Sequence, residues 1–99
     1  MKSAVIFHPL AAREYRIARK WYAARSADAN VALRIEVETA IARIVENPES
    51  LPKLFNRYRY ARVARFPYVI VFEQFSAALI RVVAVSHTSR RFGYWRRRK

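Results

Sequence analysis

The sequence lacks cysteine altogether, and it has only two histidines, His8 and His87, among its 99 residues. Disulfides and thiolate metal sites are therefore excluded, and two histidines are too few for a conventional zinc site. We predict no metal and no other cofactor. There is also no apolar run approaching the roughly 18 residues of a membrane span. The apolar residues before His8 are too few for a signal-peptide core, so we expect a cytoplasmic protein without a membrane partner.

Glycine is nearly absent as well, because Gly93 is the only one in the chain. Hydrophobic residues make up 54% of the sequence and aromatic residues 14%. This composition is typical of a compact globular protein and not of a disordered or linker-rich chain. The length fits a single domain over residues 1–99 whose basic C-terminal tail covers residues 87–99.

Acidic residues are scarce in the second half of the chain. Residues 1–49 carry eight basic and six acidic side chains, whereas residues 50–99 carry twelve basic and one acidic, Glu73. Nearly all of the formal net charge of +13 therefore belongs to the second half. Such a field favours nucleic acid, an acidic protein or anionic lipid as a partner, and by itself it does not choose among them.

Hydrophobic spacing predicts the secondary structure. Pro9 suits the first position of a helix, Ser26 and Asp28 suit the start of the next, and Pro48 ends that second helix. The strand that begins at Arg57 changes its alternation at Ala61, which predicts a β-bulge there. The expected elements are, in order, a strand over residues 4–7, helices over 10–25 and 28–46, and strands over 57–65, 68–72 and 79–86.

This order of elements, βααβββ, predicts an α+β fold. We expect an antiparallel sheet with a two-helix hairpin packed on one of its faces. The aromatic residues Tyr15, Trp21 and Tyr22 recur at helical spacing and are assigned to the core. Arg81 interrupts an apolar strand, and a buried charge needs a partner, for which Glu73 on the neighbouring strand is the candidate.

The strand from residue 57 to 65 is the first candidate binding surface. It carries four arginines, Arg57, Arg59, Arg62 and Arg65, interleaved with tyrosines. Arginines bind phosphates bidentately and aromatic rings stack on bases, so the pattern suits nucleic acid. The alternative is a solvated sheet face, which this pattern also fits.

The second candidate lies just past the last strand, at His87, Arg90 and Tyr94. Metal-free RNA cleavage needs a base for the 2′-hydroxyl, a cation for the phosphate and an acid for the leaving oxygen. These three side chains supply that combination. The alternative is that His87 only ends a strand and that Tyr94 and Trp95 fold back as a hydrophobic anchor.

The chain as a whole resembles the RelE/ParE superfamily of type II toxins, which are known from plasmid-stabilisation systems. The resemblance covers nearly the whole sequence and depends on the order of several short segments. These are residues 7–14 leading into Trp21-Tyr22, residues 44–48, residues 65–72, and residues 83–87 followed by Arg90-Arg91 and Tyr94-Trp95.

The resemblance implies a growth-inhibiting toxin that is neutralised by a cognate acidic antitoxin. ParE-like members inhibit DNA gyrase, whereas RelE-like members cleave mRNA in the ribosomal A site with arginines and a C-terminal tyrosine. Tyr94 and Arg90 match two of those nuclease positions. Thr88 and Val69 stand where the nucleases carry arginines, although His87 could compensate. The resemblance therefore favours a gyrase inhibitor over a metal-free, ribosome-dependent endoribonuclease.

For the gyrase reading, we expect the contact surface to combine the arginines of the 57–65 strand with the tail. The tail residues assigned to target or nucleic-acid binding are Arg91, Trp95, Arg96, Arg97 and Arg98. In the nuclease reading, His87, Arg90 and Tyr94 are catalytic. A third possibility is a basic nucleic-acid-binding module without toxicity. The sequence leaves the target, gyrase or ribosome with mRNA, open.

Overall fold

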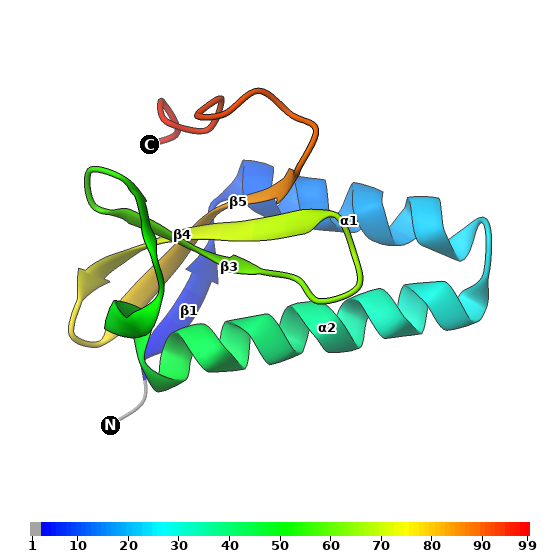
Figure 1. The fold of residues 1–99 in the computed structure, drawn as a ribbon, viewed down its shortest axis with the longest axis horizontal. Helices are drawn as coiled ribbons and strands as arrows, with labels where there is room; N and C mark the ends of the chain where they lie inside the picture. Colours follow the sequence, from blue (N-terminus) through cyan, green and yellow to red (C-terminus); the bar gives the residue numbers. More distant parts are fainter. Residues whose placement is uncertain (1–2) are drawn as a thin grey trace.

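A computed structural model of the chain describes residues 3–99 and shows two helices beside one five-stranded sheet (Figure 1). Along the chain the elements are β1 (Ala4–Phe7), α1 (Pro9–Ala23), α2 (Ala27–Glu46), the 3-10 turn η1 (Pro48–Ser50), β2 (Lys53–Phe55), β3 (Tyr58–Arg62), β4 (Tyr68–Ser76) and β5 (Leu79–His87). The βααβββ order and the α+β class predicted from the sequence are confirmed, and β2 is an addition to them.

Both helices begin at the polar residues that the sequence indicated. The Nδ1 atom of His8 accepts the backbone N–H of Leu10, and Pro9 occupies the first turn of α1. Ser26 caps α2 by accepting the N–H of Ala29 on its hydroxyl oxygen. Each cap satisfies an amide that would otherwise lack a partner at a helix start. The joint between α1 and α2 is short, so the helices form an antiparallel hairpin.

The sheet has the strand order β1-β5-β4-β3-β2 and is mixed, which corrects the expectation of a fully antiparallel sheet. Strand β1 pairs in parallel with β5, because the helical hairpin carries the chain across before the antiparallel strands β3, β4 and β5 begin. Strand β2 lies in the segment predicted as a loop. It has only three residues and follows Pro52, so its sequence carries no alternating pattern.

The predicted bulge at Ala61 is wrong. Residues of β3 pair with β4 in one continuous register, in which Ala61 faces Ile70. Arg59 and Ala61 share a face, and only the alanine is deep enough to enter the core, which explains the change of alternation in the sequence. The register shifts lie in other strands, among them β5, where Val83 is the extra residue between the Val71–Ala84 and Phe72–Val82 pairs.

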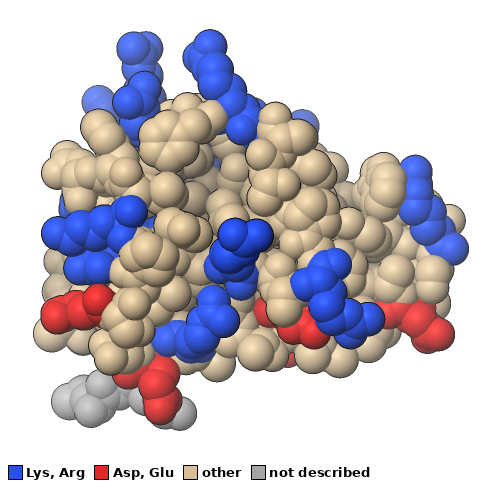
Figure 2. Space-filling view, in the orientation of Figure 1, with Lys and Arg blue, Asp and Glu red and all other residues tan. Residues whose placement is uncertain are grey.

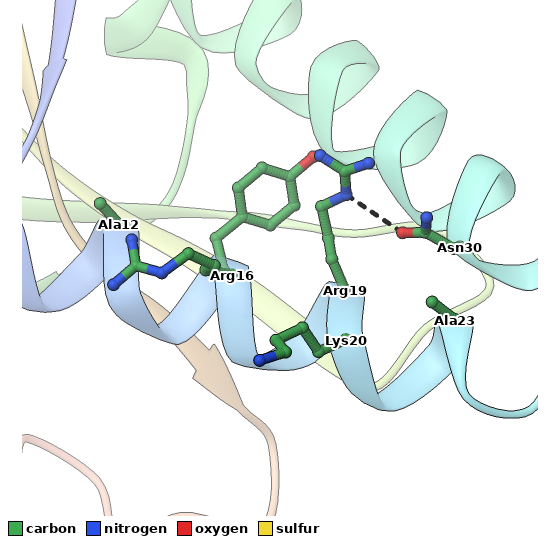
Figure 3. A pocket seen from close by; sticks show the side chains of 7 residues that line it. Ala12, Arg16, Arg19, Lys20, Ala23 and Asn30 are labelled. Carbon is green, nitrogen blue, oxygen red and sulfur yellow. Dashed lines mark hydrogen bonds between the residues drawn. The ribbon is translucent and has the colours of Figure 1, made fainter.

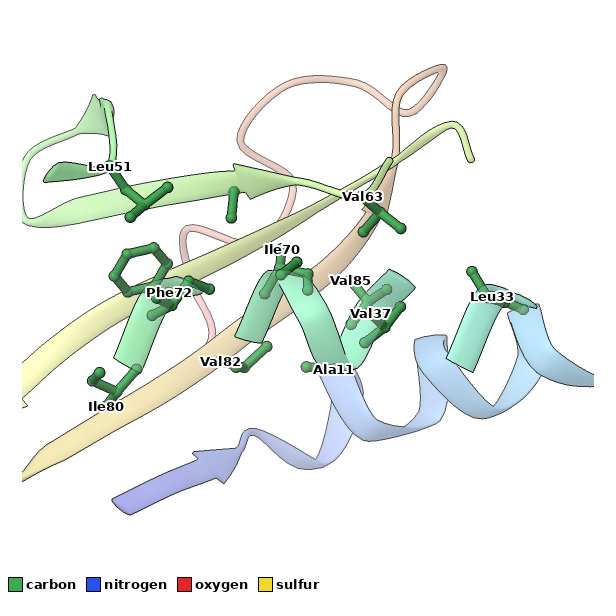
Figure 4. Packing of buried hydrophobic residues seen from close by; sticks show 14 residues of the cluster. Ala11, Leu33, Val37, Leu51, Val63, Ile70, Phe72, Ile80, Val82 and Val85 are labelled. Carbon is green, nitrogen blue, oxygen red and sulfur yellow. The ribbon is translucent and has the colours of Figure 1, made fainter. Parts of the chain in front are cut away.

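One face of the sheet packs against the helices and forms the larger core (Figure 4). Strands β4 and β5 contribute Ile70, Phe72, Ile80, Val82 and Val85, whereas the helices contribute Ala11, Ala18, Leu33, Val37, Ala40 and Ile44. Small alanines on α1 bring this helix close to β5. The hairpin therefore covers one face of the sheet.

The opposite face of the sheet is covered by the chain's own C-terminal segment, residues 88–99. Trp95 is only 2% exposed and packs edge-on against Tyr58, with ring centroids 4.9 Å apart, over Val71 and Val83. In Figure 1 this segment returns from the end of β5 and runs back over the strands. The tail is thus part of the fold, and Tyr94-Trp95 forms the anchor considered as the alternative above.

Trp21 differs from its predicted place in the core. Its side chain is 50% exposed, and the guanidinium of Arg25 lies 3.3 Å from its ring centroid. Tyr15 and Tyr22 do pack against the core at its margin. Ala11 and Ala18 hold α1 close to the sheet. The space between this helix and the sheet is therefore too narrow for the indole of Trp21, which lies at the edge of the helix's apolar stripe.

The predicted partnership of Arg81 and Glu73 is confirmed. The carboxylate of Glu73 is fully buried, and its Oε2 atom accepts hydrogen bonds from Nε and Nη2 of Arg81 at 3.0 and 2.7 Å. Its Oε1 atom accepts a third bond, from Nε of Arg57 at 2.6 Å. A buried carboxylate with two cationic partners keeps its charge compensated inside the sheet.

Replacing Glu73 with alanine leaves Arg81 largely buried without a counter-charge. We expect Glu73→Ala to lower the free energy of unfolding by about 3–5 kcal/mol, measured by urea denaturation. The matched control is Glu38→Ala, which breaks the exposed Arg34–Glu38 pair and should cost less than about 1 kcal/mol. Equal losses in the two variants would contradict a special role for the buried carboxylate.

Candidate functional site in the C-terminal segment

Within residues 3–99, the ion pairs between the tail and the rest of the domain all involve one carboxylate, that of Glu14 on α1. Its Oε2 atom accepts a 2.7 Å hydrogen bond from the hydroxyl of Tyr94 and another of 2.7 Å from Arg98. Its Oε1 atom accepts from a second nitrogen of Arg98 and from the backbone N–H of Val85, each at 3.0 Å. This single side chain therefore joins helix α1, strand β5 and the tail. Glu14 was not among the site residues predicted from the sequence.

Two arginines of the tail enclose Tyr94 beside this carboxylate. The guanidinium carbon of Arg90 lies 3.7 Å from the Tyr94 ring centroid, and that of Arg98 lies 5.0 Å from it. Arg90 also approaches Glu14, with 3.7 Å between Nη1 and Oε2. Arg98 donates in addition to the carbonyl of Val83 at 2.9 Å. The result is a compact network of one acid, one tyrosine and two arginines.

The network shifts the protonation equilibria of Glu14 and Tyr94 in opposite directions. Burial by itself would raise the pKa of the Glu14 carboxyl, but hydrogen bonds from Arg98, Tyr94 and Val85 outweigh it, so this pKa lies below the ordinary value. Burial raises the pKa of the Tyr94 hydroxyl, and its hydrogen bond to Glu14 raises it further. At neutral pH Glu14 is therefore a carboxylate and Tyr94 a neutral phenol that donates to it.

His87 ends β5, as the sequence suggested, and lies outside this network. Its ring packs edge-on against Tyr68 at 5.1 Å, and its Nδ1 atom accepts the backbone N–H of Ser89 at 3.0 Å. Within residues 3–99 it makes no hydrogen bond to Tyr94 or to Arg90. His87 and Arg90 nevertheless line a common cavity of about 210 Å³ with Tyr60 and Trp95.

The four arginines predicted along one strand do not form a single surface. Arg57 is bonded to Glu73, and Arg59 donates to the carbonyl of Leu51 at 2.6 Å. Arg62 is exposed at the end of β3, whereas Arg65 lies in the following turn, 3.8 Å from Glu36 of α2. Arg59 and Arg62 are three residues apart on a strand, so their side chains leave opposite faces.

Two tail residues assigned to target binding are committed to the fold instead. Trp95 is buried against the sheet, and the side chain of Arg98 is 11% exposed and donates hydrogen bonds to Glu14 and to the carbonyl of Val83. Because both lie on the inner side of the tail, neither offers a surface for a partner in this conformation. The exposed cations of the segment are Arg90, Arg91, Arg96, Arg97 and Lys99.

Three of these exposed arginines meet at a cavity of about 510 Å³ on the outer side of the tail. Arg91, Arg96 and Arg97 line it together with Phe55 of β2, Gly93 and Tyr94. None of the three makes an ion pair within the described residues 3–99. The lining of this pocket contains no carboxylate.

A second cavity, of about 330 Å³, lies between the two helices (Figure 3). Arg19 is held there by a 3.1 Å hydrogen bond to the side chain of Asn30 and lies 5.8 Å from the Tyr15 ring centroid. Arg16 and Lys20 line its rim. No function was predicted for these three cations from the sequence.

The charge of the surface is unevenly distributed. Figure 2 shows blue Lys and Arg side chains over the upper part, where Figure 1 draws the C-terminal segment, and red Asp and Glu side chains in the lower part near α2. No helix in residues 3–99 has the length and apolarity needed to cross a membrane. The same residues contain no group of three His, Cys, Asp or Glu side chains arranged to hold a metal ion.

A small α+β domain with the βααβββ order and a basic segment folded over its sheet has the architecture of the RelE/ParE superfamily of toxins. The comparison with family models is more specific. The model of the ParE toxin of type II toxin-antitoxin systems, parDE, matches residues 5–92, so the chain belongs to this family. It is therefore the toxin of a type II toxin-antitoxin module, and its family implies a cognate antitoxin as partner. A search of curated proteins found no match.

Replacing Glu14 with glutamine tests the network directly. We expect Glu14→Gln to lower the free energy of unfolding at pH 7 by about 2–3 kcal/mol, since charge-assisted bonds to Arg98 are lost. The low pKa of Glu14 stabilises the fold above about pH 4.3, its value when unfolded, and this contribution disappears as pH falls through the folded pKa. Urea unfolding should therefore show a stability difference between wild type and Glu14→Gln that is smaller at pH 3 than at pH 7.

Glu46→Gln is the matched control, because this substitution removes the same charge from a side chain that is exposed on α2. It should change stability by less than about 0.5 kcal/mol at either pH. A Glu14→Gln variant as stable as wild type at pH 7 would contradict a stabilising role for the Glu14 network.

Proposed function

We propose that this toxin arrests growth by inhibiting DNA gyrase and does not cleave mRNA. The observation that carries the proposal is the engagement of Tyr94, whose hydroxyl proton is donated to Glu14 and whose ring lies between two arginines. Beside His87 as base, Tyr94 would have to act as the acid, and a phenol with a raised pKa whose proton is already donated to a carboxylate is a poor general acid. Catalysis by Tyr94 would first require its hydrogen bond to the Glu14 carboxylate to break.

Two further positions support this reading. In the resemblance to RelE-like nucleases, Val69 and Thr88 stand where those enzymes carry arginines. Val69 packs at the margin of the tail-side core and pairs with Ser86, so no cation projects from β4 at this point. The backbone N–H of Thr88 donates to the carbonyl of Pro67 at 2.9 Å. The chain therefore lacks two cations that phosphoryl chemistry would use.

Ribosome-dependent mRNA cleavage is the second candidate, and one observation favours it. His87 and Arg90 line the same cavity, so a base and a cation could reach one phosphodiester there. In this reading the reaction needs no metal, with His87 as base. Under either reading the target is cytoplasmic, which implies a cytoplasmic toxin.

We further propose that the cognate antitoxin is acidic. The formal charge of +13, concentrated in residues 50–99, favours a partner whose carboxylates neutralise the exposed arginines. Its apolar side chains would lie in the groove between the helical hairpin and the sheet.

Parallel assays of gyrase supercoiling and of mRNA integrity on ribosomes distinguish the two targets. The purified toxin should block supercoiling and leave mRNA uncut. His87→Ala should inhibit gyrase as well as wild type does, because the histidine has no part in that reading. Tyr94→Phe should retain inhibition when its fold is intact, as judged by circular dichroism. Truncated mRNA with unaffected gyrase, together with loss of toxicity in His87→Ala, would overturn the proposal.

A further inference from the structure

Gly93, the only glycine of the chain, lies under the side chain of Arg96. Its backbone has φ +80°, a conformation that disfavours residues with a Cβ atom. A Cβ atom placed there would lie 2.8 Å from Nε of Arg96 and 3.1 Å from its Cδ. The glycine therefore does two things at once, since it makes the turn of the tail and leaves room for the arginine to lie across it.

The guanidinium of Arg96 is held in place although the side chain is exposed. Its Nε donates to the carbonyl of Gly93 at 3.2 Å, and its Cζ lies 5.1 Å from the ring centroid of Phe55. Phe55 itself is 42% exposed on the edge strand β2, so its ring is open to such a contact. An arginine fixed on an aromatic ring retains free N–H groups and loses little further entropy when it binds an anion.

Arg91 and Arg97 lie at the same cavity, and within residues 3–99 neither makes an ion pair. Three positive charges around one pocket repel one another unless an anion lies between them. Elsewhere in the second half of the chain, Glu73 compensates Arg57 and Arg81, and Glu14 compensates Arg98. This pocket is different, because no carboxylate lines it.

We propose that the pocket formed by Arg91, Arg96 and Arg97 binds the phosphodiester backbone of DNA. Guanidinium groups match phosphate oxygens bidentately, and several of them around one pocket can follow successive phosphates of a strand. The contact reads no base sequence. The biological role of this contact rests on the proposed function, since gyrase holds DNA. The binding itself needs only the toxin and a DNA duplex.

The test measures binding of the full-length toxin to a fluorescent 20-base-pair duplex by anisotropy over a range of salt concentrations. Three phosphate contacts predict that log K falls against log salt with a slope near −2.7, at about −0.9 per contact. Arg91→Gln/Arg96→Gln/Arg97→Gln should bind at least 30-fold more weakly and lose most of that slope. Arg16→Gln is the charge control, because Arg16 faces away from Glu14 and the tail on α1, and it should weaken binding less than twofold.

Two variants separate the geometry of the pocket from its charge. Gly93→Ala keeps every charge but displaces Arg96, and we expect threefold to tenfold weaker binding. Arg96→Lys also keeps the charge and avoids backbone strain at residue 93, so it gives the same information if the alanine variant does not fold. It should weaken binding by a similar factor, because lysine loses the bidentate and stacking contacts.

Three results would overturn the proposal. One is binding of the triple variant equal to wild type, and another is an equal loss in Arg16→Gln. The third is a preference for polyglutamate over the duplex at matched salt, which would assign the pocket to an acidic protein instead. Gyrase is absent from this assay, so DNA binding without gyrase inhibition would contradict the proposed function and leave the phosphate site intact.

Discussion

The carboxylate of Glu14 is the constraint on which the arrangement of the tail depends. The second half of the chain carries twelve basic side chains and one acidic one, and such a segment would not pack on a sheet without compensation. Glu14 supplies it from α1, 84 residues away from Arg98 in sequence, and Glu73 does the same inside the sheet for Arg57 and Arg81. These two acids thus compensate the largely buried Arg81 and Arg98, whereas Arg91, Arg96 and Arg97 make no ion pair within residues 3–99.

This division gives the tail two sides with different roles. Tyr94, Trp95 and Arg98 face inward, where they cover the second face of the sheet and bond to Glu14. Arg91, Arg96 and Arg97 face outward around a cavity without a carboxylate. The inner side fixes the position of the outer one, so a mutation at Glu14 should weaken anion binding at the proposed phosphate pocket without altering the residues that line it. The proposed binding and the stability of the fold are then linked through this segment.

Hydrophobic periodicity and capping residues predicted the two helices, the longer strands and the α+β class. The Arg81–Glu73 pair was also predictable, because a charge within an apolar strand needs a partner nearby. The parallel pairing of β1 and the three-residue strand β2 were not, since neither leaves a local pattern. Glu14 was missed for a similar reason, because its partners lie 71 to 84 residues away and no spacing rule relates them. Trp95 was assigned to target binding because it lies in a basic tail, and the sequence does not show that an apolar sheet face lies beneath it.

The Glu14–Arg98 pair attaches the tail to the domain. A double-mutant cycle measures it most directly, with Glu14→Gln, Arg98→Met and the double variant unfolded in urea at pH 7. We predict a coupling energy of at least about 1.5 kcal/mol, because the two side chains share two hydrogen bonds in a largely buried setting. A coupling energy below about 0.5 kcal/mol would show that this pair does not hold the tail in place.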